Sequence, residues 1–177
     1  MAVVGFEGWY REQHPRLVSA LTVMAGDVSV AAEVVDEAFV RAYERWGRLN
    51  GIESPTGWAF RTALNALRRR QRRAALEARL HYRWVAGGGP GRTSPSPPAD
   101  WSVEVWDAMA RLPARERTAI ALRYVADLST DEIACAMQIA PGTVGSTLHA
   151  ARRSLARALD PDGAADPAAI HEEAYNA

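Results

Sequence analysis

The segment from residue 129 to residue 155 constrains the fold more than any other part of the chain. Ser129 is followed three residues later by Glu132, which is the pattern of a capping box and predicts the start of a short helix. Pro141 suits the first turn of a second helix, because its missing N–H would have no partner there. A connection as short as residues 138–141 forces two such helices to pack on each other. The sequence therefore predicts a helix-turn-helix.

The second helix of this pair has an apolar side and a polar side. Its polar side presents Ser146, His149 and Arg153, with Arg152 nearer the flank. Such a side can enter a groove of DNA, or it can meet only solvent as in an ordinary helical hairpin, and the local pattern leaves both interpretations open. The apolar side repeats at the helical period through Val144, Leu148, Ala151 and Leu155.

A run of glycine, proline and serine divides the chain. Residues 85–100 contain this run and show no periodicity, so we expect a flexible linker between two small domains. A chain of 177 residues with 48% hydrophobic composition can form both cores. No apolar run approaches the about 18 residues of a membrane span, and no signal peptide is apparent, so we expect a soluble cytoplasmic protein without membrane insertion. The single cysteine, Cys135, cannot form an internal disulfide and suits a small buried position.

Arginines and acidic residues are concentrated in different parts of the chain. The formal net charge is zero, with 21 basic and 21 acidic residues. Every basic residue is an arginine, which suits phosphate contacts and equally suits a GC-rich genome. Arginines gather between residues 68 and 83, whereas acidic residues gather in segments 33–44 and 160–173. We expect one surface that binds a polyanion and another that meets a different partner.

The first 84 residues predict three helices and no strand. The expected helices cover residues 6–24, residues 29–46, and a segment from Pro55 into the arginine run, with Ser54 as its N-cap. In the second helix, acidic residues and Arg41 line the side opposite the apolar stripe, and the spacing of Glu37 and Arg41 allows a surface ion pair. This side is a solvated face or a docking face for a partner.

The third helix carries an arginine stripe. Arg61, Arg68 and Arg72 share one side of it with Asn65, and Trp58 lies near the same edge. Cations for a backbone, an amide for a base edge and a ring for stacking together suit a strand of nucleic acid. For Trp58, a place in the core is an equally open interpretation.

Several motifs occur together in a recognisable order. In the second half they are Leu112-Pro113, Arg117, Leu122-Arg123-Tyr124, Leu128-Ser129, Glu132-Ile133-Ala134 and Gly142-Thr143-Val144. In the first half, residues 34–43 and 55–65 complete the pattern. With these motifs the chain resembles the extracytoplasmic-function (ECF) sigma factors, bacterial transcription initiation factors that keep two helical domains called region 2 and region 4.

The resemblance implies an all-α fold of two small helical domains joined by a flexible linker. Region 2, a helical bundle, would cover residues 1–84, and region 4, the helix-turn-helix, would cover residues 101–159. The linker would cover residues 85–100. Residues 160–177 would form an acidic, disordered tail.

The resemblance also implies partners and contact residues. The partners are core RNA polymerase, through its β′ clamp helices and β flap, and promoter DNA, with an anti-sigma factor as a further candidate. The polymerase-binding residues would be Glu33, Asp36, Glu37, Phe39 and Arg41. The melted −10 element would be held by Asn50, Trp58, Arg61, Asn65, Arg68, Arg69 and Arg72. The −35 element would be contacted by Arg123, Thr143, Ser146, Thr147, His149, Arg152 and Arg153.

Five positions depart from the family pattern. Gly145, Thr147 and Ala150 stand where family members commonly carry a basic residue, and Glu33 and Asp36 replace the residues common at their positions. Each lost phosphate contact removes roughly 0.9 from the slope of log affinity against log salt. We therefore expect promoter choice to depend more than usual on the −10 element or on an activator.

Two other functions fit the same patterns. A helix-turn-helix regulator that acts without polymerase would need a dimerisation surface, and no heptad repeat is visible. A sigma-like interaction protein or decoy is compatible with the weakly charged second helix. We expect no enzymatic activity, no catalytic residue, no metal and no other cofactor, because the four histidines are scattered and no Cys/His ligand spacing occurs.

Overall fold

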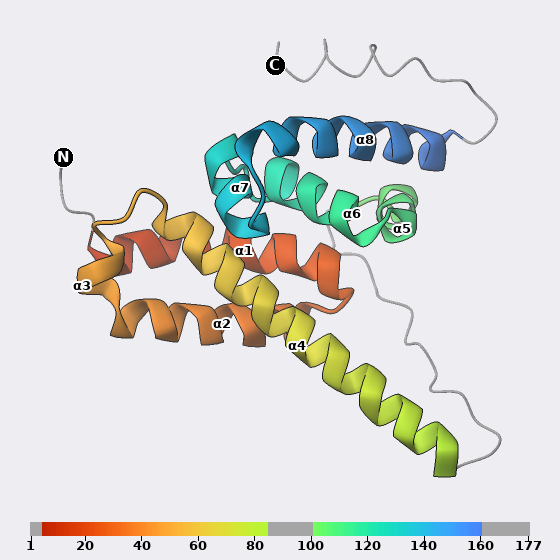
Figure 1. Ribbon diagram of the computed structural model, residues 1–177, viewed down its shortest axis with the longest axis horizontal. Helices are drawn as coiled ribbons and strands as arrows, with labels where there is room; N and C mark the ends of the chain where they lie inside the picture. The colour runs from red at the N-terminus through yellow and green to blue at the C-terminus, as the bar shows by residue number, and fades with distance from the viewer. Residues whose placement is uncertain (1–4, 85–100, 161–177) are drawn as a thin grey trace.

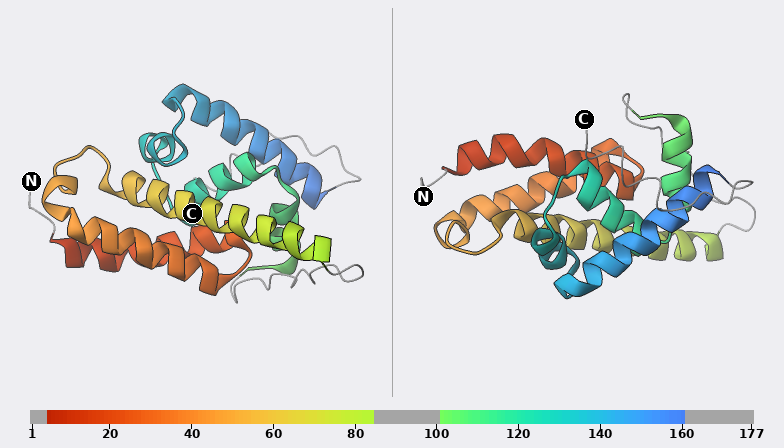
Figure 2. Two further views of the ribbon diagram at one scale, coloured as in Figure 1. Left: turned by 60° about the horizontal axis from the view of Figure 1, so that its bottom comes forward. Right: turned by 90° about the horizontal axis from the view of Figure 1, so that it is seen from above.

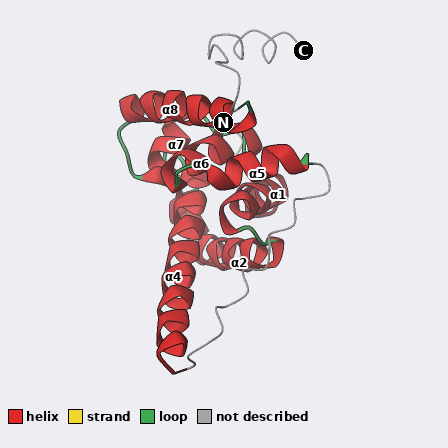
Figure 3. Cartoon of the chain, turned by 90° about the vertical axis from the view of Figure 1, so that its right-hand side faces the viewer, coloured by secondary structure: helices red, strands yellow, loops and turns green. Residues whose placement is uncertain are grey.

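The computed structural model describes residues 5–84 and 101–160. These ranges consist of helices and the short connections between them, and they contain no strand. The sequence-based prediction of an all-α fold is confirmed (Figures 1 and 3). Eight α-helices and one π-helical turn, η1, are described. They are α1 (Phe6–Ala25), α2 (Val28–Glu44), α3 (Trp46–Leu49), α4 (Pro55–Trp84), α5 (Val103–Arg111), α6 (Ala114–Ile120), η1 (Ala121–Val125), α7 (Thr130–Met137) and α8 (Pro141–Leu159).

Local capping explains where the helices of the first unit, α1–α4, begin and end. The Asp27 carboxylate accepts hydrogen bonds from the Ser29 and Val30 N–H groups at 2.7 and 3.0 Å, so α2 begins one residue earlier than expected. Its expected end at residue 46 is wrong, because the backbone of Arg45 leaves the helical region and α3 begins separately. The Ser54 hydroxyl accepts from the Gly57 N–H at 2.9 Å, as predicted for the cap of α4.

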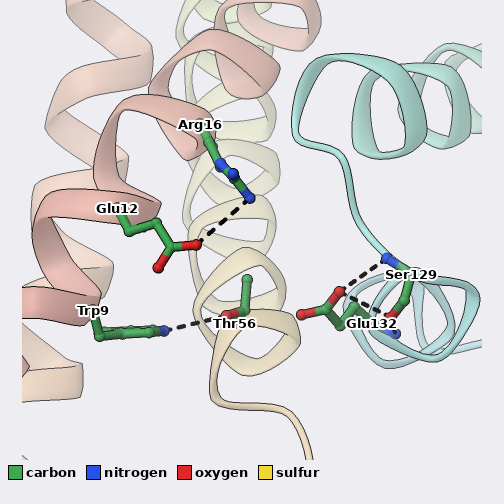
Figure 4. Close-up of polar contacts among 6 residues, drawn as sticks. All are labelled: Trp9, Glu12, Arg16, Thr56, Ser129 and Glu132. Carbon is green, nitrogen blue, oxygen red and sulfur yellow. Dashed lines mark hydrogen bonds and ion pairs between the residues drawn. The ribbon is translucent and has the colours of Figure 1, made fainter. Parts of the chain in front are cut away.

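The first unit is a bundle in which α1 packs on α2 and α2 packs on α4. The Trp9 indole Nε1 donates a buried hydrogen bond to Thr56 Oγ1 at 3.2 Å, which joins α1 to the first turn of α4 (Figure 4). Phe6, Phe39 and Trp46 pack around Trp9 with ring centroids between 4.8 and 6.5 Å apart. The aromatic residues therefore fix one end of the bundle.

The second unit, α5–α8, contains the predicted helix-turn-helix. Ser129 and Glu132 form the complete capping box of α7, with the carboxylate accepting from the Ser129 N–H at 2.9 Å. Gln138 ends α7 in the left-handed region at φ 57°, and Pro141 opens α8. α8 packs on both α6 and α7. The short connection and the start of both helices are as the sequence predicts.

The two units pack against each other, and their buried apolar side chains form one continuous core. α4 lies against α7, and α1 lies against η1 and α6 (Figures 1 and 2). At Gly57 the two units approach closely, because a Cβ atom there would lie 3.0 Å from the Cβ of Cys135 and 3.1 Å from the Glu132 carbonyl oxygen. The absence of a side chain at Gly57 thus allows α7 to approach the first turn of α4. The predicted linker lies outside the described residues.

This close approach makes Gly57→Cys a test of the packing. A cysteine there places its Cβ atom 3.0 Å from that of Cys135, about 0.5 Å short of the about 3.5–4.5 Å that disulfides prefer, so the Ser54 hydroxyl must turn aside and α7 must move back slightly. We expect the oxidised G57C chain to form an intramolecular disulfide with Cys135, read as the loss of both free thiols in a monomer. Ser146→Cys, on the exposed side of α8, is the matched control and keeps its thiols under the same oxidant. Free thiols in monomeric G57C would contradict the packing.

Candidate nucleic-acid interface

The outer side of α8 exposes the polar row that the sequence predicts. Ser146, His149 and Arg153 are exposed, while Val144 and Leu148 are buried against the rest of the second unit. The Arg153 guanidinium makes no hydrogen bond or ion pair with any described residue. This row therefore presents a hydroxyl, an imidazole and a cation to solvent on the second helix of a helix-turn-helix, where such motifs contact DNA.

One residue of the predicted set points the other way. Thr147 is only 9% exposed, and its hydroxyl donates to the Thr143 carbonyl at 2.7 Å. The prediction of a DNA contact for Thr147 is therefore corrected, because position 147 adjoins the buried stripe of Val144, Leu148 and Ala151. Thr143 itself is half-buried in the first turn of α8.

Two predicted contact arginines already have partners within the second unit. Arg123 Nη1 donates to the Leu128 carbonyl at 2.9 Å, across the loop that leads into α7. Arg152 Nε donates to the Tyr124 hydroxyl at 2.8 Å, and its guanidinium carbon lies 5.9 Å from the centre of that ring. These contacts orient both cations at the edge of the polar row, where a phosphate is a more suitable partner than a base edge.

α4 carries the second candidate surface. Trp58, Arg61 and Asn65 are half-buried, whereas Arg68 and Arg72 are exposed. The ring of Trp58 packs partly against the core, so both interpretations of this residue hold in part. Asn50 is exposed at the end of α3, in the connection that precedes α4.

The arginine run divides into partnered and unpartnered cations. Arg69 Nη2 lies 3.4 Å from a Glu37 oxygen, Arg70 pairs with Glu33, and Arg73 pairs with Glu77 at 3.0 Å. Arg68 and Arg72 form no ion pair with a described residue. The pairs from Arg69 and Arg70 join α4 to α2 over more than thirty residues of sequence, so no local pattern could reveal them.

The outer face of α2 holds the third candidate surface. The predicted ion pair between Glu37 and Arg41 is confirmed at 2.6 Å, and an oxygen of the Asp36 carboxylate lies 2.8 Å from His14 Nε2, which donates to it in the tautomer that carries its proton there. Phe39, however, is only 2% exposed, packed against the rings of Trp9 and Tyr10. The prediction of a partner contact for Phe39 is therefore corrected.

Two large side chains on α2 were missed. Val40 and Tyr43 are 59% and 66% exposed, on the same helix as the acidic residues. Their signal in the sequence was large apolar character at positions outside the buried stripe. Together with Asp36 and Arg41 they give α2 an outer face of mixed charge and apolar character, which is typical of a protein-binding surface.

Within the described part of the chain, no group of three His, Cys, Asp or Glu residues could hold a metal ion. No described helix is both long and apolar enough to cross a membrane.

Comparison with known proteins identifies both halves of the chain. The family model "Sigma-70 region 2" matches residues 9–77, and "Sigma-70, region 4" matches residues 102–155. The ECF RNA polymerase sigma factor SigL of Mycobacterium tuberculosis is 32% identical over 140 residues, covering 75% of this chain and 76% of the relative. The ECF RNA polymerase sigma-E factor of Escherichia coli is 30% identical over 163 residues, covering 86% and 83%.

A solved structure shares the fold. The sigma factor RpoE of Bartonella quintana, crystallised with the anti-sigma factor NepR, superposes with a TM-score of 0.70 at 20% sequence identity. The match covers 89% of this chain and 98% of that chain.

The capping box gives a stability prediction for the helix-turn-helix. Ser129→Ala removes the acceptor for the Glu132 N–H and one donor to its carboxylate, so we expect the free energy of unfolding to fall by about 1 kcal/mol in urea denaturation. Ser146→Ala is the matched control, because the exposed Ser146 hydroxyl bonds only to a carbonyl of its own helix. We expect Ser146→Ala to lower the free energy of unfolding by less than about 0.5 kcal/mol. Equal losses for the two variants would contradict this assignment.

Proposed function

The chain belongs to the ECF group of RNA polymerase sigma factors, and we propose how its two units divide the work of such a factor. As a sigma factor it is a transcription initiation factor that binds core RNA polymerase and promoter DNA. The unit α1–α4 would be region 2 and the unit α5–α8 would be region 4. The proposal rests on one observation above all. A single chain combines a helix-turn-helix that exposes a polar row on α8 with a long helix, α4, that carries unpartnered arginines.

We assign polymerase binding to the outer face of α2. Glu33, Asp36, Glu37 and Arg41 supply its charges, and Val40 and Tyr43 supply exposed apolar area in place of the buried Phe39. The β′ clamp helices would be the partner, and region 4 would meet the β flap. Because two of the acidic residues pair with Arg69 and Arg70, polymerase docking and the position of α4 would be coupled.

We assign the −10 element to α4 and the connection before it. Arg61, Arg68 and Arg72 would neutralise backbone phosphates of the melted strand, and Asn65 and Asn50 would reach base edges. A base that leaves the stack could rest on the exposed part of Trp58. Favourable binding to the single strand would then promote opening of the promoter, while the polymerase performs all covalent chemistry. The factor would act in the cytoplasm with the polymerase.

We assign the −35 element to the polar row of α8. Arg153 stands in this row, and Arg123 and Arg152, whose partners are uncharged, are the further phosphate contacts, whereas Gly145 and Ala150 bring no charge, so at most three phosphate contacts are available. Each phosphate contact contributes about 0.9 to the salt slope on duplex DNA, so −35 binding by this factor would depend weakly on salt. Promoter choice would then rest mainly on the −10 element or on an activator.

Engaging both elements requires the two units to separate. The −10 and −35 elements are centred about 25 base pairs apart, or roughly 85 Å at about 3.4 Å per base pair. α4 and α8, with 30 and 19 residues, span only about 45 Å and about 29 Å, which together fall short of this distance. With α7 packed on the first turn of α4, the two surfaces cannot reach both elements, so the packing described here would be that of the free factor. An anti-sigma factor remains a further proposed partner.

The direct test is run-off transcription by purified core polymerase on genomic fragments, with and without this chain. We expect new discrete start sites that depend on the chain. Scrambling the −10 element should abolish them, and scrambling the −35 element should reduce them much less. Equal loss from the two scrambles would contradict the unequal division of work. Polymerase binding without initiation would indicate a decoy, and no polymerase binding would indicate an autonomous regulator.

Substitutions on α4 test the −10 assignment. We expect Arg61→Ala to weaken binding of the holoenzyme to a single-stranded −10 oligonucleotide and to lower its salt slope by about 0.7, which corresponds to one lost phosphate contact. Arg73→Ala is the matched control, since Arg73 lies on the same helix with its guanidinium paired to Glu77. Fluorescence anisotropy at several salt concentrations measures the affinity and the salt slope of each variant. A slope unchanged in R61A, or lowered equally in R73A, would contradict the assignment.

A further inference from the structure

A cleft of about 450 Å³ lies where the two units meet. Its apolar lining includes Met24, Leu67 and Met137, which come from α1, α4 and α7. Three arginines also line it: Arg68 from α4, and Arg115 and Arg117 from α6. The cleft thus combines an apolar surface with a concentration of positive charge.

The three cations of this cleft form no ion pair with a described residue, and the buried Glu116 Oε2 between Arg115 and Arg117 in the sequence has no hydrogen-bond partner. No acidic side chain lines it, and Arg68 and Arg115 form no ion pair within residues 5–84 and 101–160. Arg117 donates only to the Ala110 carbonyl, at 3.0 Å, and burial lowers the pKa of its guanidinium below the ordinary value. By contrast, Arg69 and Arg70, on the neighbouring part of α4, both have carboxylate partners. An occupant that brings carboxylates and apolar groups would complement this site.

The chain itself contains such a segment beyond the described residues. Residues 161–177 carry four acidic residues and no arginine, with Ile170 and Tyr175 as large apolar side chains. Residues 1–160 therefore hold 21 arginines against 17 acidic residues. The excess positive charge of residues 1–160 equals the negative charge of this segment.

The segment starts close enough to reach the cleft. α8 ends beside α5, and α6, which carries Arg115 and Arg117, follows α5 directly (Figure 1). Ile170 and Tyr175 lie ten and fifteen residues beyond Asp160, so an extended chain carries them at most about 35 Å and about 53 Å from the end of α8, in each case more than the about 29 Å length of that helix. The segment can therefore pass around the end of the second unit and still place Ile170 to Tyr175 at the cleft.

We propose that the acidic C-terminal segment, residues 161–177, docks in the cleft between the two units, with its carboxylates against Arg68, Arg115 and Arg117 and its apolar side chains on the apolar lining. Because the cleft has walls from both units, the docked segment holds them together. If the factor acts on promoters as proposed above, the segment must leave the cleft when the units separate. The docking itself requires neither polymerase nor DNA.

Photocrosslinking of the full chain tests the docking directly. Tyr175 is replaced by benzoylphenylalanine, whose excited ketone inserts preferentially into the C–H bonds of methionine side chains. After irradiation of the purified protein, mass spectrometry maps the crosslinked peptide. We expect intramolecular crosslinks to Met24 or Met137, with a yield that falls as salt is raised.

Matched arginine variants make the test specific. Arg68→Gln with Arg115→Gln removes two cleft cations that have no described partner, and we expect the crosslink yield to fall about fivefold, as for the loss of two surface ion pairs. Arg45→Gln with Arg48→Gln, at the far end of the first unit, should leave the yield unchanged. Glu172→Gln with Glu173→Gln alters only the segment, so its expected loss of crosslinking cannot come from misfolding of the described helices.

Three results would overturn the proposal. They are crosslinks that map away from the cleft, crosslinks between two chains, and yields equal in the cleft and control variants. Since the assay contains only the factor, its failure would leave the assignment of promoter and polymerase surfaces untouched.

Discussion

Burial of the apolar side of α4 is the interaction on which the rest of the structure depends. Phe60 and Ala63 are fully buried, and Leu64 and Leu67 nearly so. Each large side chain stabilises the fold by roughly 1.5–3 kcal/mol when it leaves water. The N-terminal half of the helix packs against α2 and α1 on one side and α7 on the other, so its orientation is set by two units at once. That orientation decides which arginines of the same helix face α2, the cleft or solvent.

Some arginines of the described residues pair with a carboxylate, and others do not. Exposed ion pairs such as Arg70 with Glu33 and Arg73 with Glu77 add at most about 1 kcal/mol each, so they matter more for orientation than for stability. Of the cations without such partners, Arg68 and Arg115 lie on the walls of the cleft and Arg153 lies on the α8 surface assigned to DNA. Zero net charge therefore conceals a basic folded part and an acidic C-terminal segment.

Local chemistry was predictable from sequence, and long-range packing was not. The capping box at Ser129, the Ser54 cap and the Pro141 start depend on residues within four positions, and all three are confirmed. Phe39 and Thr147 were assigned to contact surfaces by resemblance to a motif, although both are buried. The hydrogen bond from Trp9 to Thr56 and the approach of α7 to Gly57 join distant residues, so only the folded chain reveals them. The exposure of Val40 and Tyr43 follows from the helical period, because both lie outside the buried stripe of α2.

On the proposed division of work, the two units lie together in the free factor and separate when it engages a promoter. A distance measurement between spin labels tests this most directly. The labels are placed at Ser19→Cys on α1 and Ala150→Cys on α8, both exposed, in a chain whose Cys135 is replaced by serine. We expect a single short distance in the free protein and an increase of tens of ångströms with core polymerase and promoter DNA. The same short distance in the promoter complex would contradict it.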